Sequence, residues 1–329
     1  MKTECQPRST EPYSLETKRV WVAGHRGMVG SALVRRLEKE GCEVLTAARH
    51  AVDLTRQASV EDWMSQTRPH AVFVAAGKVG GILANDSYPA EFLYENLMIV
   101  ANIVQAAWRM RVEKLLYLGS SCIYPRLAPQ PLAEEALLTG PLERTNEWYA
   151  IAKIAGIKLA QAYRKQHGCD FISAMPTNLY GPGDNYDLET GHVLAALLRK
   201  AHEAKLRSDP QIVIWGTGTP RREFLHVDDC ADALVHVMKV YSESEHINIG
   251  SEEDLSILEL ARLICDVVGY TGEIVHDLSK PDGTPRKLMS SKKLGALGWR
   301  PQIDLRAGIA DAYRAFLAQV GSSRGSAAR

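Results

Sequence analysis

Short runs of apolar, mostly β-branched or aromatic residues recur along the first half of the chain, at 20–23, 43–47, 71–75, 114–118 and 171–175. Between them lie stretches with apolar residues at intervals of three and four positions, clearest at 28–40, 92–110 and 149–167. Such spacing is typical of helices with one buried face. Buried strands that alternate with amphipathic helices predict βαβ units, and therefore an α/β fold with a doubly wound, parallel, Rossmann-type sheet.

The alternation of strand and helix patterns becomes less regular after about Pro182. From there on the elements are shorter, and proline and glycine are more frequent. This change predicts a smaller C-terminal lobe over the carboxyl ends of the strands, where open α/β sheets bind ligands. We expect a disordered leader at 1–17 and a Rossmann domain at 18–182, to which some later segments return. Residues 183–318 are expected to form mainly the substrate-binding lobe, and 319–329 a flexible tail.

Charge and cysteine content narrow the class of protein. The 329 residues carry 39 basic and 39 acidic side chains, so no net positive field favours nucleic acid or an anionic membrane surface. No apolar run reaches the roughly 20 residues of a membrane span. The six cysteines form no CxxC pair, and no group of residues has metal-ligand spacing. Scattered thiols of this kind predict a cytoplasmic protein.

A glycine-rich turn follows the first strand. Gly24, Gly27 and Gly30 give the pattern GxxGxxG, and Met28 and Val29 begin the next helix. Glycines allow a tight turn and close approach of a pyrophosphate, which the N–H groups at a helix N-terminus bind. The turn therefore predicts a dinucleotide site, against the alternative of a plain structural turn.

The end of the second strand indicates which dinucleotide is bound. NAD-specific sites place Asp or Glu there to bind the ribose 2′-hydroxyl, whereas this chain has Arg49, with Arg26 in the glycine turn. Two arginines without an acid favour a 2′-phosphate, so the predicted cofactor is NADP(H); solvated surface arginines are the alternative. Further cofactor contacts are expected from Asp53 and Leu54 near the adenine, and from the small residues Ala75, Ala76 and Gly77.

Tyr149 and Lys153 are four residues apart and therefore share one face of a helix. A free tyrosine has a pKa near 10, and a lysine ammonium one turn away favours the phenolate, which brings tyrosine into range for acid–base chemistry. A hydroxyl at the end of the fourth strand, Ser120 or Ser121, is placed to bind a substrate carbonyl oxygen.

Together these motifs resemble the extended short-chain dehydrogenase/reductases, a family of sugar-nucleotide epimerases, dehydratases and reductases. The resemblance selects Ser120 over Ser121. It implies that Tyr149 donates a proton to a keto oxygen and that Lys153 lowers the tyrosine pKa and binds the nicotinamide ribose. It also places four residues near the cofactor, namely Pro176, Asn178, Leu179 and His192.

Three segments, 119–125, 175–182 and 280–287, resemble one group of this family, the GDP-L-fucose synthases, and the similarity spans about 19–316. The Asp-Glu pair of the dehydratases is missing after Ser120, and Trp148 stands where proline is usual. The resemblance implies 3,5-epimerisation of GDP-4-keto-6-deoxy-D-mannose and NADPH-dependent reduction at C4. It further implies a homodimer built on a four-helix bundle from 92–110 and 149–167.

The same resemblance makes Cys122 the base and His192 the acid of epimerisation. A thiol titrates near 8.5 and a histidine near 6.5, so both groups can exchange protons near neutral pH. On the residues alone, the alternatives are a small core residue for Cys122 and a helix cap for His192.

Basic and aromatic residues of the C-terminal half are the candidates for substrate binding. Arg222 and Lys287 are placed for a diphosphate, Trp215 for the guanine or ribose, and either Arg199 or Lys200 for a further phosphate contact. The remaining candidates are Asn178, Val193 and Asp282. Two other functions stay open: another NADP-dependent nucleotide-sugar epimerase or 4-ketoreductase, and, more remotely, a non-catalytic NADP-binding sensor.

Overall fold

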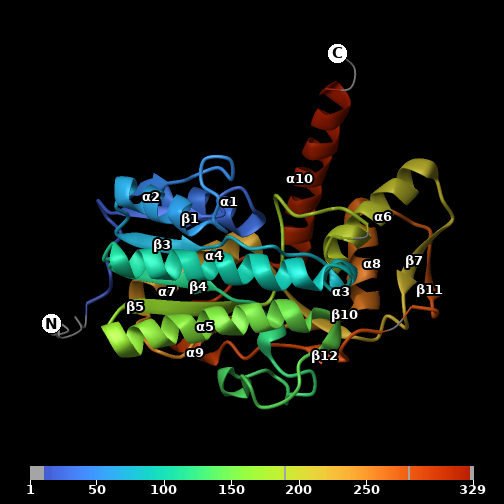
Figure 1. The fold of residues 1–329 in the computed structure, drawn as a ribbon. Coiled ribbons are helices and arrows are strands. Elements are labelled where there is room, and N and C mark those ends of the chain that lie inside the picture. Colours follow the sequence, from blue (N-terminus) through green and yellow to red (C-terminus); the bar gives the residue numbers. More distant parts are fainter. Residues whose placement is uncertain (1–10, 189, 281, 327–329) are drawn as a thin grey trace.

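A six-stranded parallel sheet forms the centre of the molecule (Figure 1). The computed structural model describes residues 11–188, 190–280 and 282–326. The strand order is β2-β1-β3-β4-β5-β9, so the chain reverses its winding direction between β1 and β3. In such sheets the reversal point opens a crevice at the carboxyl ends of the strands. The strands are β1 (Arg19–Ala23), β2 (Glu43–Leu45), β3 (Ala71–Val74), β4 (Lys114–Leu118), β5 (Asp170–Pro176) and β9 (Ile247–Ile249).

Helices cover both faces of this sheet, and each layer has its own apolar core. One core joins α1 and α7, with a contribution from α9, to the side chains of one sheet face, including Val20, Val22 and Phe73. The other joins α2, α4 and α5 to the opposite face, including Trp21, Val72 and Leu115. The helices are α1 (Met28–Leu37), α2 (Gln57–Thr67), α4 (Pro89–Arg109), α5 (Glu147–His167), α7 (Val227–Val240) and α9 (Lys292–Ala296).

The remaining elements form the smaller lobe, at the right of Figure 1, around a third apolar core. Its strands are β6 (Asn178–Tyr180), β7 (Gln211–Trp215), β8 (Arg221–His226), β10 (Asp254–Ser256), β11 (Glu273–Asp277) and β12 (Arg286–Lys287). Strand β8 is central, because it pairs with β6, β10 and β12. The helices of this part are α3 (Ile82–Ser87), α6 (Val193–Arg207), α8 (Ile257–Val268) and α10 (Leu305–Ser326), and short 3-10 turns lie at Ser121–Ile123, Glu134–Ala136 and Arg144–Asn146.

The structure refines the expected domain limits. Segments beyond residue 182 do return to the Rossmann domain, as α7, β9 and α9. The expected disordered leader is wrong for residues 11–17, because Leu15 is 1% exposed within the core and the Tyr13 N–H donates to the Lys239 carbonyl. Residues 1–10 lie outside the described part. Residues 319–326, part of the expected tail, continue α10. In the described residues no helix has the length and apolarity needed to span a membrane.

Candidate active site

The glycine turn between β1 and α1 has the geometry that a dinucleotide requires. Gly24 has φ +91°, and a Cβ there would lie 2.7 Å from the backbone of Ala76, which follows the end of β3. A Cβ on Gly30 would lie 2.1 Å from the Gly24 carbonyl oxygen. At Gly27, where α1 begins, no side chain caps the helix, and its first turn holds no acidic residue. The free N–H groups and the helix dipole therefore suit a pyrophosphate, and the predicted turn fits NADP.

The end of the site predicted to hold the adenosine is lined by the predicted arginines. Arg26 is exposed, and Arg49 is 85% exposed with its guanidinium 3.7 Å from Glu95. Arg49 also borders an open hollow of about 420 Å³, together with Thr55 and Tyr94. Both guanidinium groups are accessible, which suits binding of a 2′-phosphate.

Asp53, expected at the adenine edge, has a local structural role as well. One oxygen of its carboxylate accepts the Thr55 N–H at 3.0 Å and the Thr55 hydroxyl at 2.7 Å, and these bonds lower the Asp53 pKa. The neighbouring Leu54 packs on the core, and its carbonyl accepts a bond from Asn102. Both residues thus fix the shape of the turn after β2.

The small residues after β3 are needed for close packing, and sequence reasoning missed the residue that holds them. Asn96 of α4 is 3% exposed, accepts the Lys78 N–H at 3.1 Å and donates to the Lys78 carbonyl at 3.0 Å. A Cβ on Gly77 would lie 2.8 Å from the Asn96 amide oxygen and 3.6 Å from the Lys153 ammonium. A buried asparagine in an apolar helix face was the available signal.

Ser120, Tyr149 and Lys153 meet at the carboxyl end of β4. Burial raises the pKa of Tyr149, and the Ser120 side chain acts in the opposite direction. The Lys153 ammonium donates to the Leu118 carbonyl at 2.8 Å and lies 5.6 Å from the centre of the Tyr149 ring. Burial lowers the pKa of Lys153 to about 8. Phe92 meets the Tyr149 ring edge-on and holds it in place.

Cys122 lies in the short turn that Ser120 begins. The Ser120 hydroxyl accepts the Cys122 N–H at 3.4 Å, so one residue positions both groups. Cys122 is 6% exposed, but its surroundings include charged groups as well as apolar ones. Burial raises the thiol pKa, while Lys287, the Ser120 hydroxyl and Lys153 act in the opposite direction. This polar environment argues against a plain core residue.

His192 occupies the N-cap position of α6, yet its side chain makes no capping hydrogen bond. It instead contributes to the wall of a cavity of about 280 Å³ between the sheet and the lobe. Burial lowers the pKa of His192, and the positive charge of Lys287 lowers it further. The alternative of a helix cap is therefore not what the structure shows, and the imidazole faces the ligand space.

Most of the predicted substrate residues line this cavity. Lys200 reaches it beside Trp215, with the ammonium 5.7 Å from the ring centre, whereas Arg199 pairs with Glu203 at 2.7 Å. The structure thus favours Lys200 over Arg199 as a ligand contact. The other predicted residues in the lining are Asn178, Leu179, Val193, Trp215, Arg222 and Asp282.

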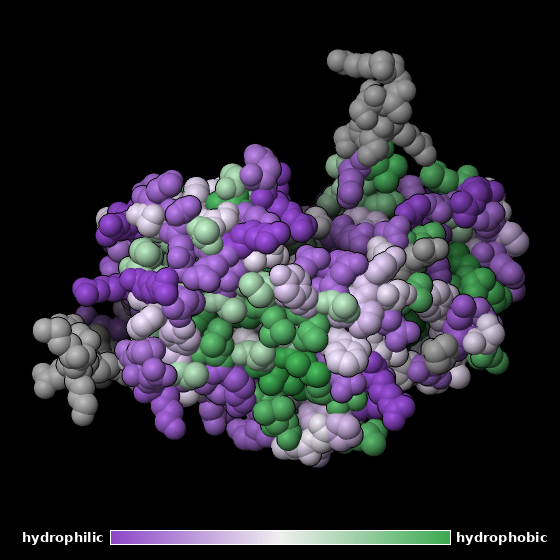
Figure 2. Space-filling view, viewed as in Figure 1, coloured by the Kyte–Doolittle hydropathy of each residue, from purple (hydrophilic) through white to green (hydrophobic). Residues whose placement is uncertain are grey.

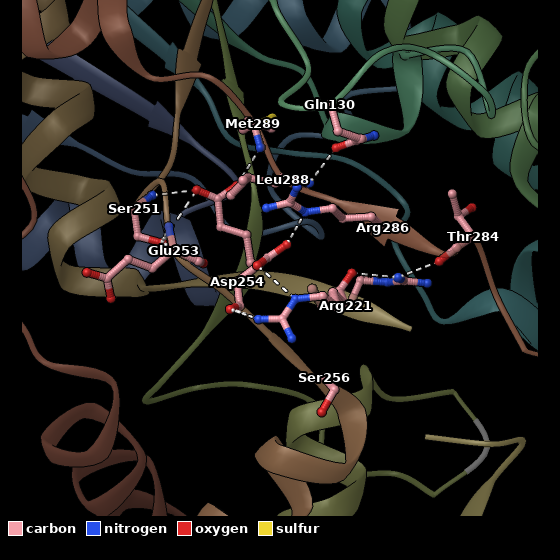
Figure 3. A network of polar contacts seen from close by, with 12 residues as sticks. Gln130, Arg221, Ser251, Glu253, Asp254, Ser256, Thr284, Arg286, Leu288 and Met289 are labelled. Atoms are coloured by element: carbon pink, nitrogen blue, oxygen red, sulfur yellow. Dashed lines mark hydrogen bonds and ion pairs between the residues drawn. The ribbon is translucent and has the colours of Figure 1, made fainter. Parts of the chain in front are cut away.

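Hydrogen bonds already fix several of these residues. The Asn178 amide donates to the Glu223 carbonyl at 2.8 Å, and the Asp282 carboxylate accepts from the N–H and hydroxyl of Thr217. Arg222 donates to the Thr284 carbonyl at 2.6 Å. Figure 3 shows how the β8 and β12 side chains around this point are bonded to their neighbours.

Pro176 and Lys287 are among the predicted residues that do not line the cavity. Pro176 is buried at the end of β5. Lys287, expected to contact a diphosphate, has Cys122 and Arg222 as its nearest strongly interacting charges.

Comparison with known proteins agrees with this geometry. A model of the NAD dependent epimerase/dehydratase family matches residues 20–250, and the chain belongs to that family. A GDP-L-fucose synthase of Sinorhizobium fredii is 62% identical over 94% of this chain and 98% of the relative. GDP-L-fucose synthase 1 of Arabidopsis thaliana is 57% identical over 93% of this chain and 95% of the relative. Within the family, the chain therefore groups with the GDP-L-fucose synthases.

A solved structure supports the same grouping. A GDP-L-fucose synthetase from Naegleria fowleri, solved bound to NADP, superimposes with a TM-score of 0.88 at 29% identity. The alignment covers 95% of this chain and 98% of that one. The predicted fold class and the predicted family resemblance are confirmed.

Proposed function

We propose that this chain is a GDP-L-fucose synthase that uses NADP(H). It epimerises GDP-4-keto-6-deoxy-D-mannose at C3 and C5 and then reduces the C4 ketone. The observation that carries the proposal is the grouping of Tyr149, Lys153 and Cys122 around Ser120 at the carboxyl end of β4. We propose Ser120, Tyr149 and Lys153 as the carbonyl-reducing group, and Cys122 with His192 of the cavity wall as the proton-exchanging pair.

The reduction needs a proton donor at the ketone oxygen, and the bound NADPH supplies the hydride. We propose Tyr149 as this donor: in the protein without ligand, burial raises its pKa, opposite to the lowering expected from Lys153, so the phenol carries its proton at neutral pH. Ser120 donates a second hydrogen bond to the same oxygen, where negative charge develops. Lys153 stays close to the phenol because its ammonium is bonded to the Leu118 carbonyl, and it stabilises the phenolate once the proton has left.

Epimerisation needs proton removal from one face of the carbon and proton return from the other. The C4 carbonyl acidifies the hydrogens at C3 and C5, and the same Tyr149 and Ser120 hydroxyls stabilise the enolate oxygen. Cys122 approaches from the β4 side and His192 from the N-terminus of α6. We therefore propose the Cys122 thiolate as the base and the His192 imidazolium as the acid.

The GDP moiety is proposed to occupy the cavity of about 280 Å³. Lys200 and Arg222 bring positive charge to its wall, and burial lowers the pKa of both groups. A diphosphate removes the cost of holding these cations away from water, since it supplies the missing counter-charge. Trp215 is 50% exposed and presents its ring for contact with a base or ribose.

The proposal is tested by incubating the protein with GDP-4-keto-6-deoxy-D-mannose and NADPH in deuterated water. We expect NADPH oxidation and a product with two solvent deuterons on carbon, in addition to the exchangeable hydroxyl positions. Oxidation without carbon-bound deuterium would identify a simple 4-ketoreductase instead. NADPH binding without turnover would identify a non-catalytic NADP-binding protein.

We further propose a homodimer that packs α4 and α5 against their copies in a four-helix bundle. These helices lie side by side at the front of Figure 1, and apolar side chains gather over them in Figure 2. Large apolar residues on them remain exposed, with Tyr94 at 59%, Trp148 at 44% and Ile151 at 37%. Light scattering coupled to size exclusion should give twice the chain mass, and Ile151→Glu should reduce it to that of one chain.

A reducing compartment such as the cytoplasm suits the protein. Cys42, Cys122, Cys230 and Cys265 are free thiols in the structure. The proposed role of Cys122 also requires a reduced thiol, because only a thiolate can accept the proton.

A further inference from the structure

Glu223 is a buried carboxylate of β8 that the proposed reaction does not use. Its exposed fraction is 0%. One carboxylate oxygen accepts the Ser251 N–H at 2.6 Å and the Glu252 N–H at 2.8 Å, and the other accepts the Met289 N–H at 3.0 Å. The bonds of Ser251 and Met289 can be followed in Figure 3. Burying a carboxylate costs free energy unless donors satisfy its oxygens, so these bonds fix the side chain in one place.

The bonds of this carboxylate join segments that belong to different parts of the molecule. Glu223 lies on the lobe strand β8, whereas Ser251 and Glu252 follow β9, the edge strand of the central sheet. Met289 follows β12 and forms a bridge with Leu132. The Glu223 carboxylate therefore holds β8 against both the central sheet and the segment after β12.

The other face of β8 forms part of the cavity wall. Successive side chains of a strand point to opposite faces, so Arg222 and Phe224 point away from the Glu223 carboxylate. Both line the cavity of about 280 Å³ that we propose for the GDP moiety. The Glu223 carbonyl also accepts the Asn178 amide at 2.8 Å, and Asn178 lines the same cavity. The place of Glu223 thus decides where these side chains of the wall lie.

Arg222 depends on the position of β8 in particular. Among the residues that the structure describes, it forms no ion pair with a carboxylate. Its guanidinium donates to the Arg221 carbonyl at 2.8 Å and to the Thr284 carbonyl at 2.6 Å. Carbonyl groups leave the positive charge available to an anionic ligand, and the direction of the N–H donors then depends on where the strand lies. A shift of β8 would misalign these donors.

Gly250 shows how little space surrounds the Glu223 carboxylate. A Cβ on Gly250 would lie 2.4 Å from one Glu223 carboxylate oxygen and 2.9 Å from the Ser291 hydroxyl oxygen. Contacts of less than 3.0 Å force one of the groups to move. Gly250→Ala would therefore displace the carboxylate without removing it, which provides a second way to disturb its bonds.

We propose that Glu223 is a positioning residue for substrate binding: by binding the backbone at 251, 252 and 289, its carboxylate holds Arg222 and Asn178 in the orientation that the GDP-sugar requires. The inference rests on the proposed function. Glu223 acts from behind the strand and does not line the cavity itself. The glycine turn of the cofactor site lies between β1 and α1, so binding of NADPH should not depend on Glu223.

The affinities for GDP and NADPH test this separation in Glu223→Gln and Gly250→Ala. A glutamine side chain has one acceptor oxygen and an NH2 group, so it cannot accept N–H donors at both positions. In each variant we expect the Kd for GDP to rise about tenfold and the Kd for NADPH to stay within about twofold of wild type. Fluorescence titration measures both constants. Unchanged affinity for GDP, or an equal loss for both ligands, would overturn the proposal.

Chemical modification of Arg222 tests the same inference without a ligand. Phenylglyoxal modifies accessible guanidinium groups, and mass spectrometry of the Arg222 peptide follows the rate. We expect this rate to rise about threefold to tenfold in Glu223→Gln and Gly250→Ala, because the shifted strand weakens the bonds of Arg222 to carbonyl groups. An unchanged rate would contradict the positioning role. If the wild-type protein bound no GDP, the proposed function would fail, and these rates would still decide whether Glu223 positions Arg222.

Asp229→Asn is the matched control for loss of a buried carboxylate. Asp229 of α7 is 4% exposed, and its carboxylate likewise accepts two backbone N–H groups, from Gln302 at 3.0 Å and Ile303 at 2.9 Å. It is not among the residues that line the cavity. We expect wild-type affinity for GDP and a wild-type rate of Arg222 modification, even where urea unfolding shows reduced stability. Changes as large as those of Glu223→Gln would show a general loss of structure and would overturn the proposal.

Discussion

Gly30→Ala should weaken cofactor binding by about two orders of magnitude, whereas Gly27→Ala in the same turn should be tolerated by the fold. A Cβ on Gly30 would lie 2.1 Å from the Gly24 carbonyl oxygen and 2.8 Å from the His25 Cα. Side-chain carbons stay at least about 3.0 Å from such atoms, so the turn must open by about 1 Å. All of the atoms that a Cβ on Gly30 would meet belong to the backbone. Gly24 in turn packs closely against the backbone of Ala76, so it has little room to move away. At Gly27 the nearest atom is 3.5 Å away, which is an ordinary contact.

The magnitude follows from the N–H groups that the displaced turn misaligns. Loss of two charge-assisted hydrogen bonds to a pyrophosphate, at about 1.5 kcal/mol each, costs about 3 kcal/mol. This corresponds to a Kd for NADPH that is roughly 150-fold higher. The strain should also reduce the free energy of unfolding by about 1–3 kcal/mol.

Fluorescence titration with NADPH measures the affinity, and urea unfolding measures the stability, in wild type and both variants. Gly27→Ala should unfold at nearly the wild-type urea concentration, because its Cβ meets no protein atom closely. Gly30→Ala with wild-type affinity for NADPH would show that α1 can shift without cost, and would refute the reasoning from close contact.

Three further outcomes are expected. Tyr149→Phe should lower kcat for NADPH oxidation by about 10²- to 10⁴-fold, because the proton donor is removed, while circular dichroism shows an unchanged fold. Lys200→Met should raise KM for the GDP-sugar by about 10- to 100-fold, and Arg199→Met should leave it near wild type because that guanidinium pairs with Glu203. Burial raises the pKa of Asp184 from 3.8 to about 7, so the folded state keeps a proton that the unfolded state has released between these pH values. Stability should therefore fall by about 4 kcal/mol from pH 4 to pH 7, a loss that urea unfolding should not find in Asp184→Asn.

Patterns within short segments of the sequence were sufficient to predict the strands, the glycine turn and the helices of the cofactor-binding part of the site. The five expected strands all appear in the central sheet, and the helices expected at 92–110 and 149–167 appear as α4 and α5. A buried strand, a glycine turn and a helix N-terminus follow one another directly in the chain, so their geometry is set within about ten residues. The spacing of Tyr149 and Lys153 is equally local, since four residues along a helix complete about one turn.

The substrate half depends on segments that are far apart in the sequence. Lys287 lies beside Arg222 only because β12 pairs with β8, and the following residue, Leu288, is bonded to 130–132. The choice between Arg199 and Lys200 depends on which side of α6 faces the cavity, and the packing of α6 against α8 and α10 decides this. Neither arrangement leaves a periodic pattern in the sequence.

The sequence by itself determined the parallel sheet, the dinucleotide turn, the Ser120–Tyr149–Lys153 group and the family, because hydrophobic period, glycine spacing and helical spacing are short-range properties. Only the tertiary structure decided the electrostatic surroundings of Cys122 and His192 and the packing of residues 11–17. Charge–charge interaction and burial depend on distance through space, and the distances between remote residues exist only once the chain has folded.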